Sequence, residues 1–135
     1  MDKVAIIYKS KYGSSKKYAL LLSKKLNTKV FETDKTTVCD LLDFDTIIYL
    51  GGVYLGKISG FSFIKKNYKE IEDKKIIACA VCATTKFEEA RLRLINHNLD
   101  KKLKDKIPLF ILRGSLYYEK MNFIDKFLMS ALIMS

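Results

Sequence analysis

The sequence predicts an α/β fold, a three-layer doubly wound sandwich built on a five-stranded parallel sheet. Short apolar runs alternate with segments of helical spacing along the chain, and these runs are apolar on both faces. Strands of that kind belong to a parallel sheet that helices cover on both sides, with right-handed crossovers between the strands. The expected strands are residues 3–8, 29–32, 45–50, 75–82 and 107–112.

The length and composition of the chain suit one globular domain, residues 1–135. Hydrophobic residues make up 49% of the chain, with one proline and six glycines, which indicates a packed core rather than a disordered segment. The start of the chain shows no signal-peptide pattern, and no run of about 18 apolar residues occurs. Three cysteines, an odd number, are typical of a reducing compartment, so we expect a cytoplasmic protein.

The first strand leads into a hydroxyl-rich loop, residues 10–15 (Ser-Lys-Tyr-Gly-Ser-Ser), and then into a helix that we expect to continue through Leu26. A loop in this position can bind a phosphate, because its N–H groups converge, its hydroxyls donate and the helix N-terminus adds partial positive charge. The alternative is an ordinary connection in which Ser14 or Ser15 caps the helix. The first strand is also expected to lie inside the sheet rather than at its edge.

Three further segments have helical spacing. Residues 61–71 place apolar side chains on one face and lysines on the other, and residues 87–99 form a helix with His97 facing inward. No cysteine or carboxylate cluster accompanies this histidine, so a metal role is not expected. The closing helix, residues 118–134, carries an apolar stripe that we interpret as a cover of the sheet. Residues 131–134 are apolar all round and leave open a peripheral membrane contact.

The unusual loops of the chain all follow expected strands. In a doubly wound fold, ligands bind at the carboxyl ends of the strands, where the strand order reverses. Glycine or hydroxyl residues gather at that edge in residues 10–15, 51–57, 82–85 and 113–115. The pattern therefore predicts one composite ligand site at the carboxyl edge of the sheet.

The net charge of +10, from 25 Lys and Arg against 15 Asp and Glu, favours an anionic partner. The lysines are spread along the chain, and no block of five or more basic residues occurs. No nucleic-acid signature accompanies them, so we expect no nucleic-acid binding.

Two local motifs have other interpretations. Residues 51–57 nearly match a nucleotide P-loop, but Ile58 follows Lys57 where the motif needs a Ser or Thr, which argues against an NTPase. Cys79 and Cys82 form a C-x-x-C motif inside an expected strand. Residues three apart in a strand point to opposite faces, so these thiols are not expected to pair or to share a metal.

The chain resembles the flavodoxin family over nearly its whole length. Residues 6–15 (Ile-Ile-Tyr-Lys-Ser-Lys-Tyr-Gly-Ser-Ser) look like the FMN-phosphate signature of flavodoxins. Residues 44–60 are similar to the flavin-ring loop of a flavodoxin-domain branch that includes the flavodoxin-type protoporphyrinogen oxidases. Residues 112–114 (Leu-Arg-Gly), with the helix after them, also resemble that branch. The resemblance implies the flavodoxin-like strand order 2-1-3-4-5.

The resemblance also implies FMN as the cofactor and assigns residues to it. The FMN-phosphate side comprises Ser10, Lys11, Tyr12, Gly13, Ser14 and Ser15. The flavin-ring side comprises Gly52, Val53, Tyr54, Leu55 and Gly56, with Tyr54 stacking on the ring, and then Ala83, Thr84 and Thr85 at its pyrimidine side. In the family, a loop peptide near the flavin rearranges with redox state, and we expect Gly56 to allow this.

The function we expect is FMN-binding electron transfer, with no catalytic residue of the protein's own and no metal. Typical small flavodoxins are acidic and this chain is basic, so we expect its redox partner proteins to be acidic. One alternative is a flavodoxin-type oxidoreductase such as a protoporphyrinogen oxidase. Another is a flavodoxin-like module that binds a phosphate ligand or a protein without redox chemistry.

Overall fold

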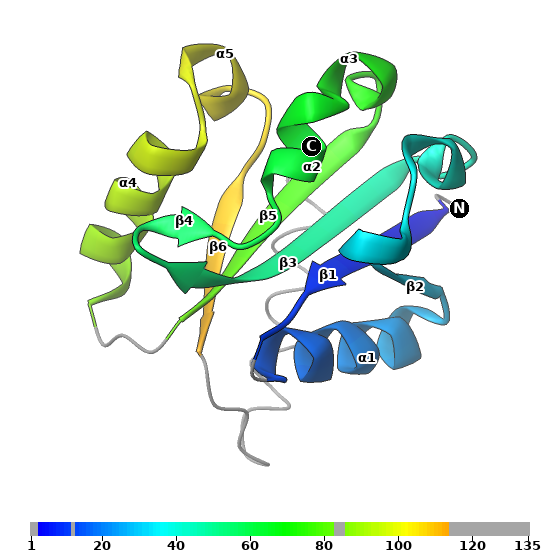
Figure 1. Cartoon of the computed structure of the whole chain (residues 1–135), viewed down its shortest axis with the longest axis horizontal. Helices are drawn as coiled ribbons and strands as arrows, with labels where there is room; N and C mark the ends of the chain where they lie inside the picture. Colours follow the sequence, from blue (N-terminus) through cyan, green and yellow to red (C-terminus); the bar gives the residue numbers. More distant parts are fainter. Residues whose placement is uncertain (1–2, 12, 83–85, 114–135) are drawn as a thin grey trace.

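A computed structural model of the chain describes residues 3–11, 13–82 and 86–113. Its sheet contains parallel strands in the order β2-β1-β3-β5-β6, and a short β4 pairs only with β3 (Figure 1). Without β4, this is the predicted order 2-1-3-4-5, with β1 inside the sheet. The parallel strands are β1 (Val4–Lys9), β2 (Lys29–Glu32), β3 (Thr46–Tyr54), β5 (Lys75–Cys82) and β6 (Leu109–Arg113).

Each face of the sheet carries its own apolar cluster, because successive residues of a strand point to opposite faces. Along β3, Ile47 and Tyr49 belong to one cluster, whereas Ile48 and Leu50 belong to the other. All four side chains are fully buried. The apolar runs of the sequence are therefore strands covered on both faces, as predicted.

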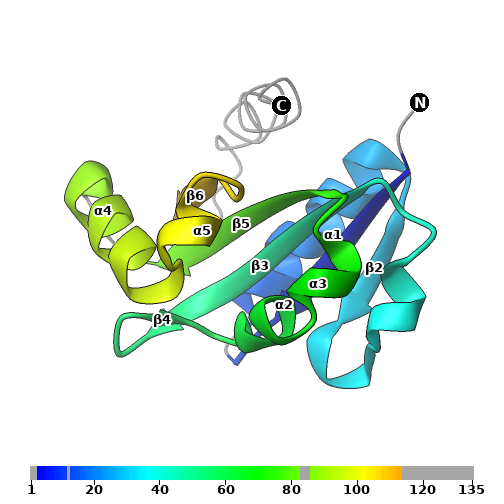
Figure 2. The ribbon, with the colours of Figure 1, turned by 90° about the horizontal axis from the view of Figure 1, so that it is seen from above.

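Helices cover both faces of the sheet, which completes the three predicted layers (Figure 2). On one face lies α1 (Ser14–Leu26). The other face is covered by α2 (Ser62–Lys66), α3 (Tyr68–Ile71), α4 (Phe87–Asn98) and α5 (Lys101–Lys104). Two 3-10 turns, η1 (Thr33–Lys35) and η2 (Val38–Leu41), connect β2 to β3.

None of the described helices combines the length and the apolarity that crossing a bilayer requires. The expected closing helix, residues 118–134, and the membrane contact considered for it lie outside the described residues.

Two elements differ from the expectation. The helix expected over residues 61–71 is interrupted at Asn67, whose side-chain Nδ2 donates to the Phe63 carbonyl at 2.8 Å. An asparagine side chain that bonds to nearby backbone competes with regular helix geometry. The last strand was expected at residues 107–112 and instead begins after Pro108, which has no N–H to donate to a ladder.

The third strand was expected to end at Leu50, but β3 continues through Gly51 and Gly52 to Tyr54. It then turns and pairs with the antiparallel β4 (Lys57–Ile58). The two residues between these strands, Leu55 and Gly56, have φ values of 51° and 77°. Positive φ at both central residues is the geometry that suits the twist of a two-residue hairpin. Residues 51–57 are thus a β-hairpin rather than a nucleotide P-loop.

The two cysteines of the C-x-x-C motif lie on opposite faces of β5, as predicted. Cys79 is fully buried in the cluster beneath α1, whereas the half-buried Cys82 packs against the cluster on the other face. Burial raises the pKa of both thiols. No group of three or more His, Cys, Asp or Glu side chains that could hold a metal occurs within the described residues.

Candidate functional site

The loop between β1 and α1 lies at the carboxyl edge of the sheet. The hydroxyl of Ser10 accepts a hydrogen bond from the Gly13 N–H at 2.8 Å, which closes the loop onto the start of α1. Gly13 has a φ of 95°, a backbone conformation that L side chains rarely adopt. A Cβ at this position would have no atom within 4 Å, so the backbone rather than crowding requires glycine here.

The start of α1 is unusually positive. The first N–H groups of any α-helix lack intrahelical partners, and the helix dipole makes this end attractive to anions. The first turn of α1 contains no acidic residue, and it contains Lys16 and Lys17 instead. Cations at a helix N-terminus oppose the dipole, so this arrangement destabilises α1 unless an anion lies nearby. In the same turn, Ser14 is half-buried and Ser15 is 2% exposed.

The β3–β4 hairpin rises beside this loop. Lys9 of β1 pairs with Gly51 of β3, so the β1–α1 loop and the hairpin leave the sheet as neighbours. The ammonium of Lys11 lies 5.3 Å from the ring centroid of Tyr54, within the range of a cation–π interaction. Tyr54 is 66% exposed and Leu55 is 82% exposed. The hairpin tip therefore presents an uncovered aromatic ring next to the positive loop.

The base of the hairpin is closely packed. A Cβ on Gly51 would lie 2.5 Å from the Ser59 carbonyl oxygen, so only glycine fits there without a shift. That carbonyl accepts a hydrogen bond from the Tyr49 hydroxyl, and the Ser59 N–H donates to the Gly52 carbonyl at 2.8 Å. These contacts fix where the hairpin emerges from the sheet.

The outer edge of the hairpin is held by α4. Asn98, 3% exposed, accepts from the Ile58 N–H through Oδ1 at 2.8 Å. Its Nδ2 donates to the Gly56 carbonyl at 3.1 Å and to the Leu94 carbonyl at 2.8 Å. The side-chain amide thus joins two backbone groups of the hairpin to the helix.

A cavity of about 370 Å³ lies between the hairpin and α4. Its volume falls within the range of small-molecule sites, and it opens at the same edge of the sheet as the loop. The described residues that line it are Val53, Gly56, Cys82, Ala90, Arg93, Leu94 and His97.

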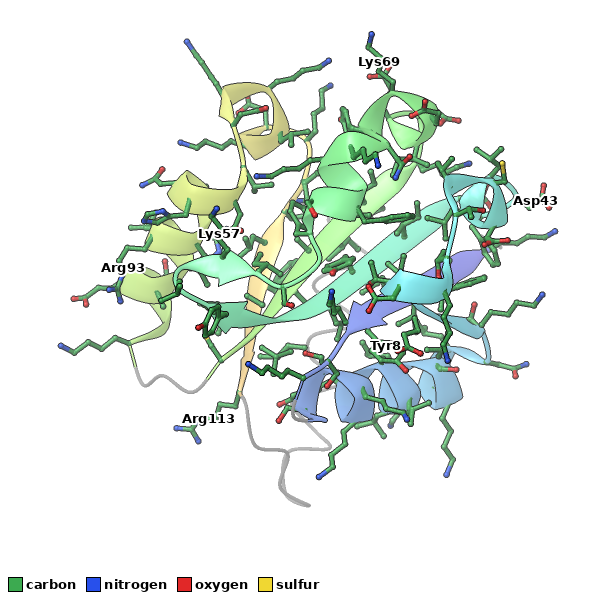
Figure 3. The ribbon with its side chains drawn as sticks, in the orientation of Figure 1. Tyr8, Asp43, Lys57, Lys69, Arg93 and Arg113 are labelled. Carbon is green, nitrogen blue, oxygen red and sulfur yellow. The ribbon has the colours of Figure 1, made fainter. Side chains whose placement is uncertain are left out.

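Basic side chains surround this edge. Figure 3 shows Lys57, Arg93 and Arg113 at the edge where β3, β5 and β6 end. Burial raises the pKa of Tyr18 on α1, and the positive charge of Arg113 opposes that rise. Lys9, by contrast, forms an ion pair with Asp34 at 3.2 Å, so its charge is partly neutralised.

The structure brings the described residues of the predicted site to one edge, although only Val53 and Gly56 among them line the cavity. The expected ligand residues that lie outside the described part of the chain are Tyr12, Ala83, Thr84 and Thr85. The expectation that His97 faces inward is wrong, because its side chain is exposed. A Cβ added to Gly56 would lie 3.8 Å from the His97 ring, so this histidine packs against the hairpin turn instead.

Sequence reasoning missed Arg93 and Asn98. Arg93 lies on the polar surface of a helix and reads as an ordinary solvated charge. Asn98 is buried and polar, and its partners Gly56 and Ile58 lie 42 and 40 positions earlier in the sequence. No local pattern connects such distant residues.

A family of known proteins matches nearly the whole chain. The family description "Flavodoxin domain" matches residues 5–135. No curated protein sequence matches the chain.

Solved structures share the fold at low sequence identity. A WrbA-like flavodoxin from Agrobacterium tumefaciens has a TM-score of 0.68 and 16% identity, covering 97% of this chain and 95% of that one. A short-chain flavodoxin associated with a bacterial microcompartment has a TM-score of 0.65 and 18% identity, with coverages of 98% and 97%. A flavoprotein from Lactobacillus acidophilus, in complex with FMN, has a TM-score of 0.54 and 13% identity, with coverages of 93% and 99%.

Proposed function

The chain belongs to the flavodoxin-domain family, and from this premise we propose that it binds FMN and transfers electrons through it. One observation carries the proposal. The positive β1–α1 loop and the exposed ring of Tyr54 lie side by side, joined by the contact between Lys11 and that ring. A ligand with an anionic group at one end and a flat aromatic system at the other matches both features. The Lactobacillus acidophilus flavoprotein, a structural neighbour in complex with FMN, supports this choice.

The residues present fit the phosphate of FMN. The N–H groups at the start of α1 donate, the positive φ of Gly13 lets the loop close, and Ser14 and Ser15 supply hydroxyls. Ser10 supports the loop through its bond to Gly13, and Lys11 adds charge. Hydrogen bonds between such donors and a dianion are stronger than neutral ones. We therefore assign most of the binding free energy of FMN to this loop.

The residues on the ring side orient the flavin and limit its contact with water. Tyr54 offers a face for stacking, and the neighbouring Leu55 offers apolar surface. Val53 and Gly56, which line the cavity beside α4, lie on the same hairpin. Bound FMN supplies the electron-transfer chemistry, while the protein binds it, orients it and adjusts its potential.

The charge of the protein suggests the chemistry of its partners. With a net charge of +10 and basic side chains at the site edge, the protein favours acidic redox partners. Exposed charges act through water and are screened by salt, so this preference should weaken as ionic strength rises.

Reconstitution with FMN tests the proposed function. We expect the purified full-length chain to retain FMN through gel filtration, to shift the flavin absorption bands, and to be reduced by dithionite and reoxidised by ferricyanide. A chain that binds FMN but cannot be reduced and reoxidised while bound would support the phosphate-binding module instead. A chain that retains no FMN would contradict the proposal.

Lys16→Gln should change stability and FMN affinity in opposite directions. Removing a cation from the first turn of α1 removes its conflict with the helix dipole, so the FMN-free protein should unfold at a slightly higher urea concentration. The same change removes a charge that attracts the phosphate, so FMN should bind about threefold more weakly at low salt. Urea titration and FMN fluorescence titration measure the two effects.

Lys24→Gln is the matched control, because Lys24 lies in the last turn of the same helix, where a cation suits the dipole. It should lower stability slightly and leave FMN affinity unchanged. Equal losses of FMN affinity for the two variants would show that α1 does not receive the phosphate.

A further inference from the structure

The buried side chain of Asn98 connects the hairpin turn to α4. We infer that Asn98 is a positioning residue, which holds the Gly56 carbonyl toward α4 and thereby withholds it from a flavin at the hairpin tip. The inference rests on the proposed function for its consequence, but the contact itself stands without a ligand.

The side-chain amide of Asn98 bonds to the backbone along the edge of β4 as a neighbouring strand would. Its Oδ1 accepts from the Ile58 N–H and its Nδ2 donates to the Gly56 carbonyl, which are the groups on either side of Lys57 along the outer edge of β4. A neighbouring strand would present its N–H and C=O to these same two groups. Both Nδ2 protons are used, the second by the Leu94 carbonyl one helical turn earlier on α4. Asn98 therefore holds one group of each of the two peptides on either side of Lys57.

The turn that Asn98 holds is a strained one. Leu55 has a φ of 51°, a conformation that costs a non-glycine residue free energy, and its side chain is 82% exposed. Such a conformation persists where the surrounding structure enforces it. Gly56, next to it, can adopt several conformations at little steric cost. The hydrogen bond from Asn98 to the Gly56 carbonyl holds this residue in one of them.

The consequence for a bound flavin follows from its hydrogen-bonding chemistry. Atom N5 of an oxidised flavin accepts a hydrogen bond, whereas the same atom carries a proton and donates when the flavin is reduced. A backbone carbonyl delivered to that atom would therefore stabilise the reduced form. The bond from Asn98 keeps the Gly56 carbonyl elsewhere, so the rearrangement expected at Gly56 must first break that bond. Asn98 thus acts as a latch that favours the oxidised form.

Asn98→Ala tests the latch, with Asn96→Ala as the matched control. Asn96 is an exposed asparagine on the same helix, and its Oδ1 accepts a hydrogen bond from the Lys104 ammonium at 2.8 Å. In the FMN-free protein, the Ile58 amide should exchange with deuterium about tenfold faster or more in Asn98→Ala and at the wild-type rate in Asn96→Ala. With FMN, the affinity for reduced relative to oxidised flavin should rise at least about threefold in Asn98→Ala alone, as obtained from the midpoint potentials of free and bound FMN.

The outcomes separate the latch from the proposed function. If the Ile58 amide keeps its protection in Asn98→Ala, the contact does not hold the hairpin and the inference is wrong. If that protection is lost and the affinity ratio stays at the wild-type value, the positioning role toward the flavin is wrong, although the proposed function stands. Failure of the wild-type chain to bind FMN would contradict the proposed function and the role of Asn98 toward the flavin, and the exchange measurement in the FMN-free protein would still test the contact.

Amide exchange in the wild-type chain provides a test that does not depend on the folding of a variant. The Ile58 amide should be protected from exchange in the FMN-free wild-type protein, because it donates to the buried Asn98 side chain. Exchange of this amide at the rate of an unprotected one would overturn the inference.

Discussion

Gly51→Ala is expected to lower the free energy of unfolding by about 3 kcal/mol, the upper end of the usual cost of overpacking a well-packed interior. The new Cβ would lie 2.5 Å from the Ser59 carbonyl oxygen and 2.9 Å from Cγ2 of Ile58. The Ser59 carbonyl cannot move freely, because it accepts a hydrogen bond from the Tyr49 hydroxyl and the Ser59 N–H donates to the Gly52 carbonyl. Urea unfolding of the FMN-free protein measures the loss.

Gly52→Ala is the control for this prediction. A Cβ on Gly52 would meet its nearest atom, the Val81 carbonyl oxygen, at 3.9 Å, which is ordinary contact. This variant should lower the free energy of unfolding far less than Gly51→Ala. The new Cβ has room, and alanine reduces the conformational freedom of the unfolded chain. Equal losses at the two neighbouring glycines would show that the packing at the hairpin base is not as described.

Gly13→Val is expected to weaken FMN binding by about 10- to 100-fold and riboflavin binding much less. Loss of one charge-assisted hydrogen bond costs about 1.5–3 kcal/mol, and valine at a φ of 95° would force the loop out of its phosphate-binding conformation. Riboflavin lacks the phosphate, so its affinity depends mainly on the ring side of the site. Fluorescence titrations with the two ligands measure the difference.

Gly13→Asn separates the backbone from the side chain. Asparagine tolerates positive φ better than other residues with a Cβ, and the position has open space around it. Its loss of FMN affinity should therefore be smaller than that of the valine variant. If both variants lose FMN and riboflavin equally, the β1–α1 loop does not bind the phosphate.

The sheet could be predicted from the sequence because its signal is local. The strands Lys29–Glu32 and Lys75–Cys82 were expected with the boundaries that the structure shows, since each is a short run between polar segments. The end of β3 could not be placed, because consecutive glycines usually mark a turn. Here Gly51 is needed for the close approach of the Ser59 backbone, a contact between separate segments that no local pattern reveals.

The candidate site could be predicted in part, for the same reason. The carboxyl ends of parallel strands meet at one edge, so the loop around Gly13 and the segment around Tyr54 were expected to be neighbours, and the contact between Lys11 and Tyr54 confirms this. The role of α4 could not be predicted. Asn98 and Arg93 reach the hairpin and its cavity only through the packing of the helix on the sheet, which depends on the whole fold.

The most direct test of FMN binding through the β1–α1 loop compares FMN with riboflavin in the wild-type protein. We place the phosphate against the β1–α1 loop, where N–H donors and cations converge. FMN should therefore bind at least about tenfold more tightly than riboflavin at low salt, and the ratio should fall as salt screens the charges. Equal affinities for the two ligands, independent of salt, would contradict it.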